Sequence, residues 1–503
     1  MLRFIVVCVG LVGCAQPAGT DVAETGGGSS STSAGELETA GLTTAEPADA
    51  TTDATTDGGL ASSDTLVSTG SDETSTGSPA RPDPLPAAVP YLERFLAEVD
   101  DKVLADVTPN PFTAQHDLAA YYTIARTNVL LANLDVAVLT RDQEVSLLAS
   151  LAVLGDFLAD VEMGDNACAT TVRTDFAHYF PPVPRHGWGF VSGAQSEAYA
   201  ASYPECELAE PLLVEVVSAD ANPPLIRFGY NDGHALWALA RIVRVFCAYD
   251  VESDRAERYD LLGRTVLDDW LAQHAGAPHD LPGLYYEEFH DGVDYAGHPH
   301  QRLYWAVNSN AALGRAMIEF AEIDPAGADP YWSMAASIAD VWKNETTSIT
   351  GGAYAWVYAR SARPQDEYVE DTVHAGVSMP FIAAAFSSEL GPMPATVFAS
   401  DITATAAAID LVVPPPDRDV VRARMDGQAD VGPPQDLAPS DYRLVGEWAA
   451  LAPALRAIDY DEAEAYLAVL DAVTSLGDTE TEHPGYGYYR LTLDSYAIAA
   501  LAQ

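Results

Sequence analysis

Apolar side chains recur every three to four positions along most of the chain after residue 88. This spacing is typical of helices that bury one face, whereas the alternation typical of a strand is clearest at residues 212–217. The pattern predicts a mostly helical protein. The expected helices lie at residues 91–104, 116–139, 141–161, 232–248, 256–273, 302–321, 331–343, 371–389, 395–412, 442–457, 461–473 and 491–500.

Long segments rich in glycine, proline and aromatic residues separate these helices. They lie at residues 162–231, 275–301, 344–369 and 476–490. Loops of this length in a compact domain usually carry function. Consecutive helix pairs with such loops predict an all-α domain over residues 88–503. We expect an alpha/alpha toroid, in which helical hairpins surround a central axis and the long loops gather at one end.

The first residues have the composition of an export signal. A positively charged start precedes an apolar run that is too short to cross a bilayer. The run ends in Leu-Val-Gly-Cys at residues 11–14, which resembles the lipobox of bacterial lipoproteins. The resemblance implies a signal peptide at residues 1–13 and a lipidated Cys14. Because Ala15 replaces the aspartate of an inner-membrane retention signal, it also implies the outer membrane or cell surface. An ordinary secretory signal with a chance cysteine is the alternative.

Residues 14–87 consist largely of serine, threonine, glycine, alanine and acidic residues. Such a segment has too few apolar side chains to offset the entropy of folding, so we expect a disordered tether. The net charge of the chain is −49, and residues 1–90 hold 12 acidic and 2 basic side chains. The remaining part therefore carries −39 and is acidic in its own right. This charge excludes nucleic acid as a partner and leaves the lipid as the only membrane contact.

Five cysteines occur in the chain. Cys168 and Cys206 lie in the same long loop segment and are the preferred disulfide pair in an oxidising compartment. Cys247 follows an apolar run, which is typical of a buried thiol that behaves as a small hydrophobe. The cysteine spacings give no indication of a zinc site.

Polar and ionisable residues recur in the first turns of alternate predicted helices. In a toroid these positions would converge at one end of the central cavity. The catalytic candidates are Asp232, His234, Glu370, Asp371, His374 and Glu447, and Asn308 and Asn310 are candidates for substrate binding.

Structural roles are the alternative for these residues. An aspartate at a helix start is often an N-cap or a partner of the helix dipole, and a histidine on an apolar face is often a hydrogen-bonded core residue. The combination of Glu370, Asp371 and His374 favours a functional role, because spacings of three and four residues place both carboxylates near the imidazole. A carboxylate beside an imidazole orients its tautomer for acid/base work.

Aromatic side chains supply a second indication. Tyr354, Trp356 and Tyr358 alternate, so they would share one face of an extended segment, and Tyr488 precedes the last helix. Flat rings stack on the apolar faces of sugars, although they equally cover helix ends. Arg302 and Arg360 are candidates to bind a substrate carboxylate.

Three segments resemble secreted bacterial alpha/alpha-toroid proteins. They are Leu-Tyr-Trp-Ala-Val-Asn-Ser-Asn-Ala-Ala-Leu-Gly-Arg-Ala-Met from residue 303, Gly-Ala-Tyr-Ala-Trp-Val-Tyr from residue 352, and Tyr-Val-Glu-Asp-Thr-Val-His-Ala from residue 368. The proteins that they resemble are related in outline to alginate-lyase-like and glucuronyl-epimerase-like carbohydrate enzymes. The resemblance covers residues 303–390 and implies a carbohydrate polymer or oligomer as the partner.

Lyase, hydrolase and epimerase chemistry stay open at this point, as does a monomeric surface lipoprotein that binds glycans or a protein without turnover. In a lyase, His374 or His234 would take the proton beside a uronate carboxylate. In a hydrolase, two of the carboxylates would flank the glycosidic bond. The charge of −39 opposes a polyanionic substrate, although salt screens it beyond about 8–10 Å. We expect no cofactor and no metal, since the sequence around His298 and His300 fixes no metal geometry.

Overall fold

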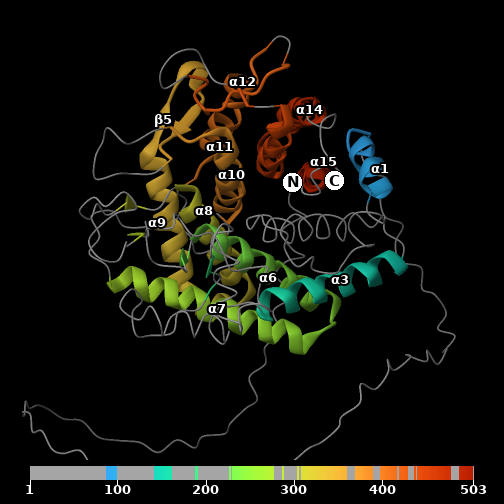
Figure 1. Cartoon of the computed structure of the whole chain (residues 1–503), viewed down its shortest axis with the longest axis vertical. Coiled ribbons are helices and arrows are strands. Elements are labelled where there is room, and N and C mark those ends of the chain that lie inside the picture. The colour runs from blue at the N-terminus through green and yellow to red at the C-terminus, as the bar shows by residue number, and fades with distance from the viewer. Residues whose placement is uncertain are drawn as a thin grey trace, which may run out of the picture. The chain divides into compact units, whose positions relative to one another are not determined.

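The computed structural model describes residues 86–98, 141–160, 187, 189–190, 226–227, 229–276, 286–287, 303–304, 307–358, 369–388, 397–415, 418–428, 436–437, 439–476 and 486–501. The described part is mostly helical, as the sequence predicts (Figure 1). The predicted helix at 116–139, the predicted strand at 212–217, the signal peptide and the tether lie outside the described residues. None of the described helices is long and apolar enough to span a bilayer.

The helices account for most of the described elements. The α-helices are α1 (Val89–Glu98), α3 (Arg141–Asp160), α6 (Gly229–Tyr249), α7 (Ser253–Gly276), α8 (Val307–Ile323), α9 (Asp329–Glu345), α10 (Thr372–Ser387), α11 (Ala399–Ala406), α12 (Ile409–Val412), α13 (Ala452–Ile458), α14 (Tyr460–Leu476) and α15 (Tyr486–Leu501). The 3₁₀ helices are η5 (Pro325–Gly327), η6 (Thr350–Gly352) and η9 (Pro439–Leu451).

Three short antiparallel pairs of strands complete the described elements. They pair β1 (Gly189–Phe190) with β2 (Ile226–Arg227), β3 (Tyr286–Glu287) with β4 (Leu303–Tyr304), and β5 (Thr346–Ser348) with β6 (Tyr354–Trp356). The hairpin of β5 and β6 lies within the segment expected to be a long loop.

Several predicted helices have different bounds in the structure. The last one, α15, begins at Tyr486 instead of 491, inside the segment expected to be a loop. The helix expected from residue 302 begins at Val307, because Leu303 and Tyr304 pair with the distant strand β3. The helix expected at 395–412 is divided into α11 and α12, since Ala408 N donates to Thr405 O in a tighter turn. The helix expected at 442–457 begins as η9 and becomes α13 at Ala452. Pro453 has no N–H to donate to the carbonyl four residues earlier, which interrupts the α-helical pattern there.

Alternate helices pack against one another in chain order. Helix α6 packs on α8, α8 on α10, α10 on η9, and η9 on α15, while α7 packs on α6, α9 on α8, and α14 on η9. The first described helix also packs on the last, where Arg94 Nε donates to Asp494 Oδ2 at 2.9 Å. The helices that carry the predicted polar starts are therefore neighbours.

Glycines set the spacing of these neighbouring helices. A Cβ at Gly233 of α6 would lie 2.4 Å from the backbone carbon of Ala312 in α8, and one at Gly314 of α8 would lie 2.6 Å from the ring of Phe381 in α10. Real Cβ atoms do not approach so closely, so both contacts require glycine. The backbones of α6 and α8 are in direct contact at Gly233.

Replacement of Gly233 by alanine tests this close approach. Because the added Cβ meets backbone rather than a movable side chain, we expect Gly233→Ala to lower the free energy of unfolding by about 1–3 kcal/mol, measured in urea. Gly327→Ala is the control, since its nearest neighbour is Asp324 Oδ2 at 3.6 Å. Equal stability of Gly233→Ala and the wild type would contradict the packing described.

Candidate functional site

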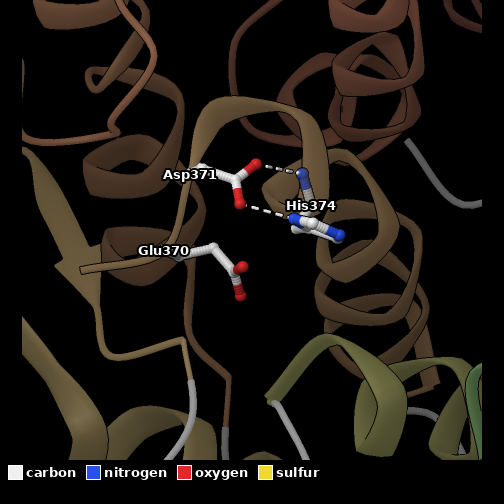
Figure 2. A group of neighbouring side chains, drawn as sticks. All are labelled: Glu370, Asp371 and His374. Carbon is white, nitrogen blue, oxygen red and sulfur yellow. Dashed lines mark hydrogen bonds and ion pairs between the residues drawn. The ribbon is translucent and has the colours of Figure 1, made fainter. Parts of the chain in front are cut away.

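Asp371 begins α10 and fixes His374 in place. Its Oδ1 accepts a hydrogen bond from His374 N at 2.9 Å, which caps the helix, and its Oδ2 lies 2.5 Å from His374 Nδ1 (Figure 2). Both side chains are partly exposed. Burial alone would raise the pKa of Asp371, but the hydrogen bonds from His374 outweigh it and hold the pKa below its ordinary value. The pair is an ionised carboxylate that orients an imidazole.

Glu370 lies directly beneath this pair and is fully buried. Its Oε2 accepts a hydrogen bond from Trp356 Nε1 at 3.2 Å, while Oε1 has no hydrogen-bond partner among the described residues. Burial, followed by the nearby charge of Asp371, raises the pKa of Glu370 well above its ordinary value. The two adjacent carboxyl groups are therefore held in opposite protonation states.

Glu370, Asp371 and His374 each offer one donor atom, and these atoms lie within 4.8 Å of one another (Figure 2). Such a group could hold a metal ion, which the sequence did not indicate. A metal would need Glu370 to be ionised, and without a metal the burial of this side chain favours the neutral form. The same three residues can also serve acid/base chemistry.

Glu447 joins the same region from η9. A Cβ built at Gly376 of α10 would lie 3.1 Å from Glu447 Oε2, so the glycine makes room for this carboxyl group. Glu447 is half-buried, and burial raises its pKa to about 7, against the opposing effect of Arg315 and then of His374. A carboxyl group with such a pKa can both hold and release a proton near neutral pH.

Tyr358, which the sequence predicts as a substrate-binding residue, lies beside His374. The centroids of the two rings are 5.2 Å apart. The backbone carbonyl of Tyr358 accepts a hydrogen bond from Val307 N at 2.7 Å, which ties this residue to the start of α8. An aromatic face thus borders the acid/base group.

Arg315, Trp237 and Tyr496 belong to the same region but were missed by the sequence reasoning. The guanidinium of Arg315 stacks on the ring of Trp237, with 3.6 Å from Cζ to the ring centroid, and Nη2 donates to Tyr496 Oη at 3.0 Å. The signal available in the sequence was one arginine within the apolar run of residues 311–320. His234 is buried nearby, and burial followed by the charge of Arg315 lowers its pKa to about 3, so the imidazole is neutral.

Other predicted residues have structural partners. Asp232 lies inside the first turn of α6 rather than before it, and its buried Oδ2 accepts from Trp270 Nε1 at 2.7 Å. Tyr354 donates from its hydroxyl to Asp401 at 3.2 Å, away from His374. Trp356 is 1% exposed and packs against Trp342, so the expectation that it stacks on a sugar does not fit; its indole supports Glu370 instead.

Asn308 and Asn310 are both buried at the start of α8, as the apolar pattern around them suggests. Asn308 Oδ1 accepts from Ser309 N at 2.8 Å. The remaining predictions cannot be placed: Cys14, Cys168, Cys206, His298, His300, Arg302 and Arg360 lie outside the described residues. Tyr488 belongs to α15, but its side chain is not among those described.

Cys247 is disulfide-bonded, so the expectation of a lone buried thiol is wrong. It is the one cysteine in the described ranges. The pairing of Cys168 with Cys206 stays a prediction. A bond from Cys247 to either of them would exclude it.

Comparison with known proteins adds little to this geometry. No protein-family model matches the chain, and no curated protein does either. A solved structure titled "Glycosidase Wild Type" is distantly similar, with 14% sequence identity and a TM-score of 0.37 over 82% of this chain and 95% of that chain. A TM-score below 0.5 does not establish a common fold, so this similarity carries no argument about the reaction.

The opposite protonation states of Glu370 and Asp371 predict opposite effects on stability. The folded protein keeps a proton on Glu370 that the unfolded chain releases above a pKa of 4.5, so the free energy of unfolding falls as the pH rises above that value. Glu370→Gln removes the carboxyl group, and with it the fall in the free energy of unfolding at higher pH. We expect it to be more stable than the wild type at pH 7 and to equal it at pH 4.

Asp371→Asn is the matched control in the same urea unfolding experiment. Because the pKa of Asp371 is lowered in the folded protein, its ionised form stabilises the fold above the ordinary aspartate pKa. This variant should be less stable than the wild type at pH 7 and lose that difference as the pH falls below about 3.8. A Glu370→Gln protein that is destabilised at both pH values would refute the neutral buried acid.

Proposed function

We propose that this protein is a surface-anchored carbohydrate-active enzyme that works by proton transfer between its side chains and a sugar substrate. One observation carries the proposal: Asp371 is hydrogen-bonded to the imidazole of His374, Glu447 lies close enough for His374 to influence its pKa, and the pKa values of the two carboxyl groups are displaced in opposite directions. Two titratable groups whose pKa values are shifted in opposite directions by their surroundings are typical of an acid and a base in one site.

The roles follow from the protonation states. Glu447 is protonated up to a pH of about 7 and would donate its proton to the oxygen that leaves the sugar. Asp371 orients His374, whose Nε2 would accept a proton from water in hydrolysis, or from a sugar carbon in elimination and epimerisation. The ring of Tyr358 would stack on the sugar beside His374.

Carbohydrate as the substrate class is supported by residues 303–390, whose three segments resemble alpha/alpha-toroid carbohydrate enzymes. We infer the toroid itself from the packing order α6, α8, α10, η9 and α15, with the remaining helices outside them and α1 against α15. In this arrangement His234, Asn310, His374 and Glu447 lie on inner helices. The inferred toroid is therefore consistent with an acid/base group at its central cavity.

Anchoring at the outer membrane or cell surface is supported by the lipobox at residues 11–14 and the tether that follows it. Lipidation would hold the enzyme at the membrane, and a tether of about 70 residues would let it reach polymers in the surroundings. The acid/base domain would then act outside the cell.

Activity on neutral and acidic polysaccharides tests the enzyme proposal. His374→Ala and Glu447→Gln should each lower kcat/KM by about 10²–10⁴-fold, whereas Tyr354→Phe, which removes a hydroxyl bonded to Asp401, should keep wild-type activity. The rate should fall as the pH rises through about 7, when Glu447 loses its proton. Mass spectrometry of the new chain ends distinguishes hydrolysis from elimination, and altered stereochemistry in an uncleaved chain indicates epimerisation. Binding without turnover would favour the glycan-binding alternative.

Metabolic labelling with palmitate tests the anchor separately. The wild-type protein should take up label and fractionate with membranes, because two or more acyl chains bind durably. Cys14→Ser should remain unlabelled and be recovered in the soluble fraction or as the uncleaved precursor. Equal labelling of the two proteins would contradict lipidation at Cys14.

A further inference from the structure

Arg315 is a buried cation without an ion pair among the described residues. The charge of Glu319 acts on it, but that carboxylate is paired with Arg241 and Arg244. Only 8% of its surface is exposed, and its two contacts among the described residues are the ring of Trp237 and the hydroxyl of Tyr496. No carboxylate oxygen of the described chain lies within ion-pair distance of its guanidinium. A guanidinium has five N–H donors, and this one donates a single hydrogen bond.

Other arginines at helix contacts in this protein are neutralised. Arg94 bonds Asp494, Arg244 pairs with Glu319, and Arg264 pairs with Asp260. Arg264 is the closest match to Arg315, because it also stacks on aromatic rings, those of Phe320 and Tyr331. A buried charge is costly unless an opposite charge compensates it. Arg315 therefore has the features of an anion-binding site.

The position of Arg315 links it to the proposed reaction. Its charge lowers the pKa of Glu447, which extends from η9, and that of His234, which extends from α6. Its contacts with Trp237 and Tyr496 place it where α6, α8 and α15 meet. A ligand group that reaches Arg315 would thus lie close to the proton of Glu447.

We propose that Arg315, stacked on Trp237, binds a carboxylate of the substrate, so that the enzyme acts on an acidic carbohydrate. The planar fork of a guanidinium matches the two oxygens of a carboxylate, and the aromatic ring beneath keeps the fork in one orientation. This inference rests on the proposed function. It also answers the objection that a protein with this negative charge would repel an acidic sugar, because the attraction is local and buried, where salt screens little.

Binding measured by calorimetry tests the carboxylate site without requiring turnover. The probes are trigalacturonate, triglucuronate, the methyl ester of each, and cellotriose as a neutral sugar. We expect the full-length wild-type protein to bind at least one acid at least tenfold more tightly than its ester. Arg315→Met should lose that preference, and Arg315→Lys should retain part of it, because it keeps the charge without the fork.

Stability without ligand separates recognition from a structural role. Since Arg315 makes no ion pair in the part of the chain that the structure describes, Arg315→Met should unfold at a temperature equal to or above that of the wild type. Arg264→Met, which breaks the pair with Asp260, should be destabilised yet keep the wild-type preference for the acid over its ester.

Three results would overturn the inference. They are equal affinity of the wild type for each acid and its ester, unchanged acid affinity in Arg315→Met, or no binding of any acidic probe. A preference for the acid in the absence of any turnover would support the carboxylate site while refuting the enzyme proposal, so the two can fail separately.

Discussion

The alternate helices α6, α8, α10 and η9 meet at glycines, and the rest of the site depends on these contacts. Gly233 lets α6 reach the backbone of α8, Gly314 accommodates Phe381 of α10, and Gly376 accommodates Glu447 and Trp448 of η9. Each contact removes the side chain that would otherwise keep two helices apart. His234 and Glu447, which lie near these glycines, are consequently held in poorly solvated surroundings, with the partly exposed His374 close by.

Low solvation then decides the protonation states of Glu370, Glu447 and His234. It raises the pKa of Glu370 and Glu447 and lowers that of His234, because burial disfavours whichever form is charged. Asp371 escapes this effect through its two hydrogen bonds to His374. Burial and these hydrogen bonds together yield neutral acids close to an ionised carboxylate, and Arg315 is buried nearby without an ion pair among the described residues.

The sequence predicts the helices well wherever their signal is local. The period of apolar residues locates α3, α7, α9 and α14 closely, and the spacing of Glu370, Asp371 and His374 correctly brings the last two into contact. The start of α8 is missed, because Leu303 and Tyr304 pair with a strand that no local pattern identifies.

The residues that contact the site residues also could not be predicted from the sequence. Trp356 appears as a sugar-stacking residue from its alternation with two tyrosines, whereas it is buried and holds Glu370. Arg315 is hidden among apolar neighbours, and its contacts come from two helices far away in the chain. Contacts of this kind depend on tertiary packing rather than on the period of apolar residues along the chain.

The central claim is that burial holds a proton on Glu447 near neutral pH beside an ionised Asp371. The most direct test is a ¹³C NMR titration of glutamate side-chain carboxyl groups, with the Glu447 resonance assigned by its disappearance in Glu447→Gln. The account predicts a midpoint near pH 7 for this resonance. A midpoint near the ordinary value of 4.5 would show that Glu447 is ionised in the folded protein and would contradict its role as the proton donor.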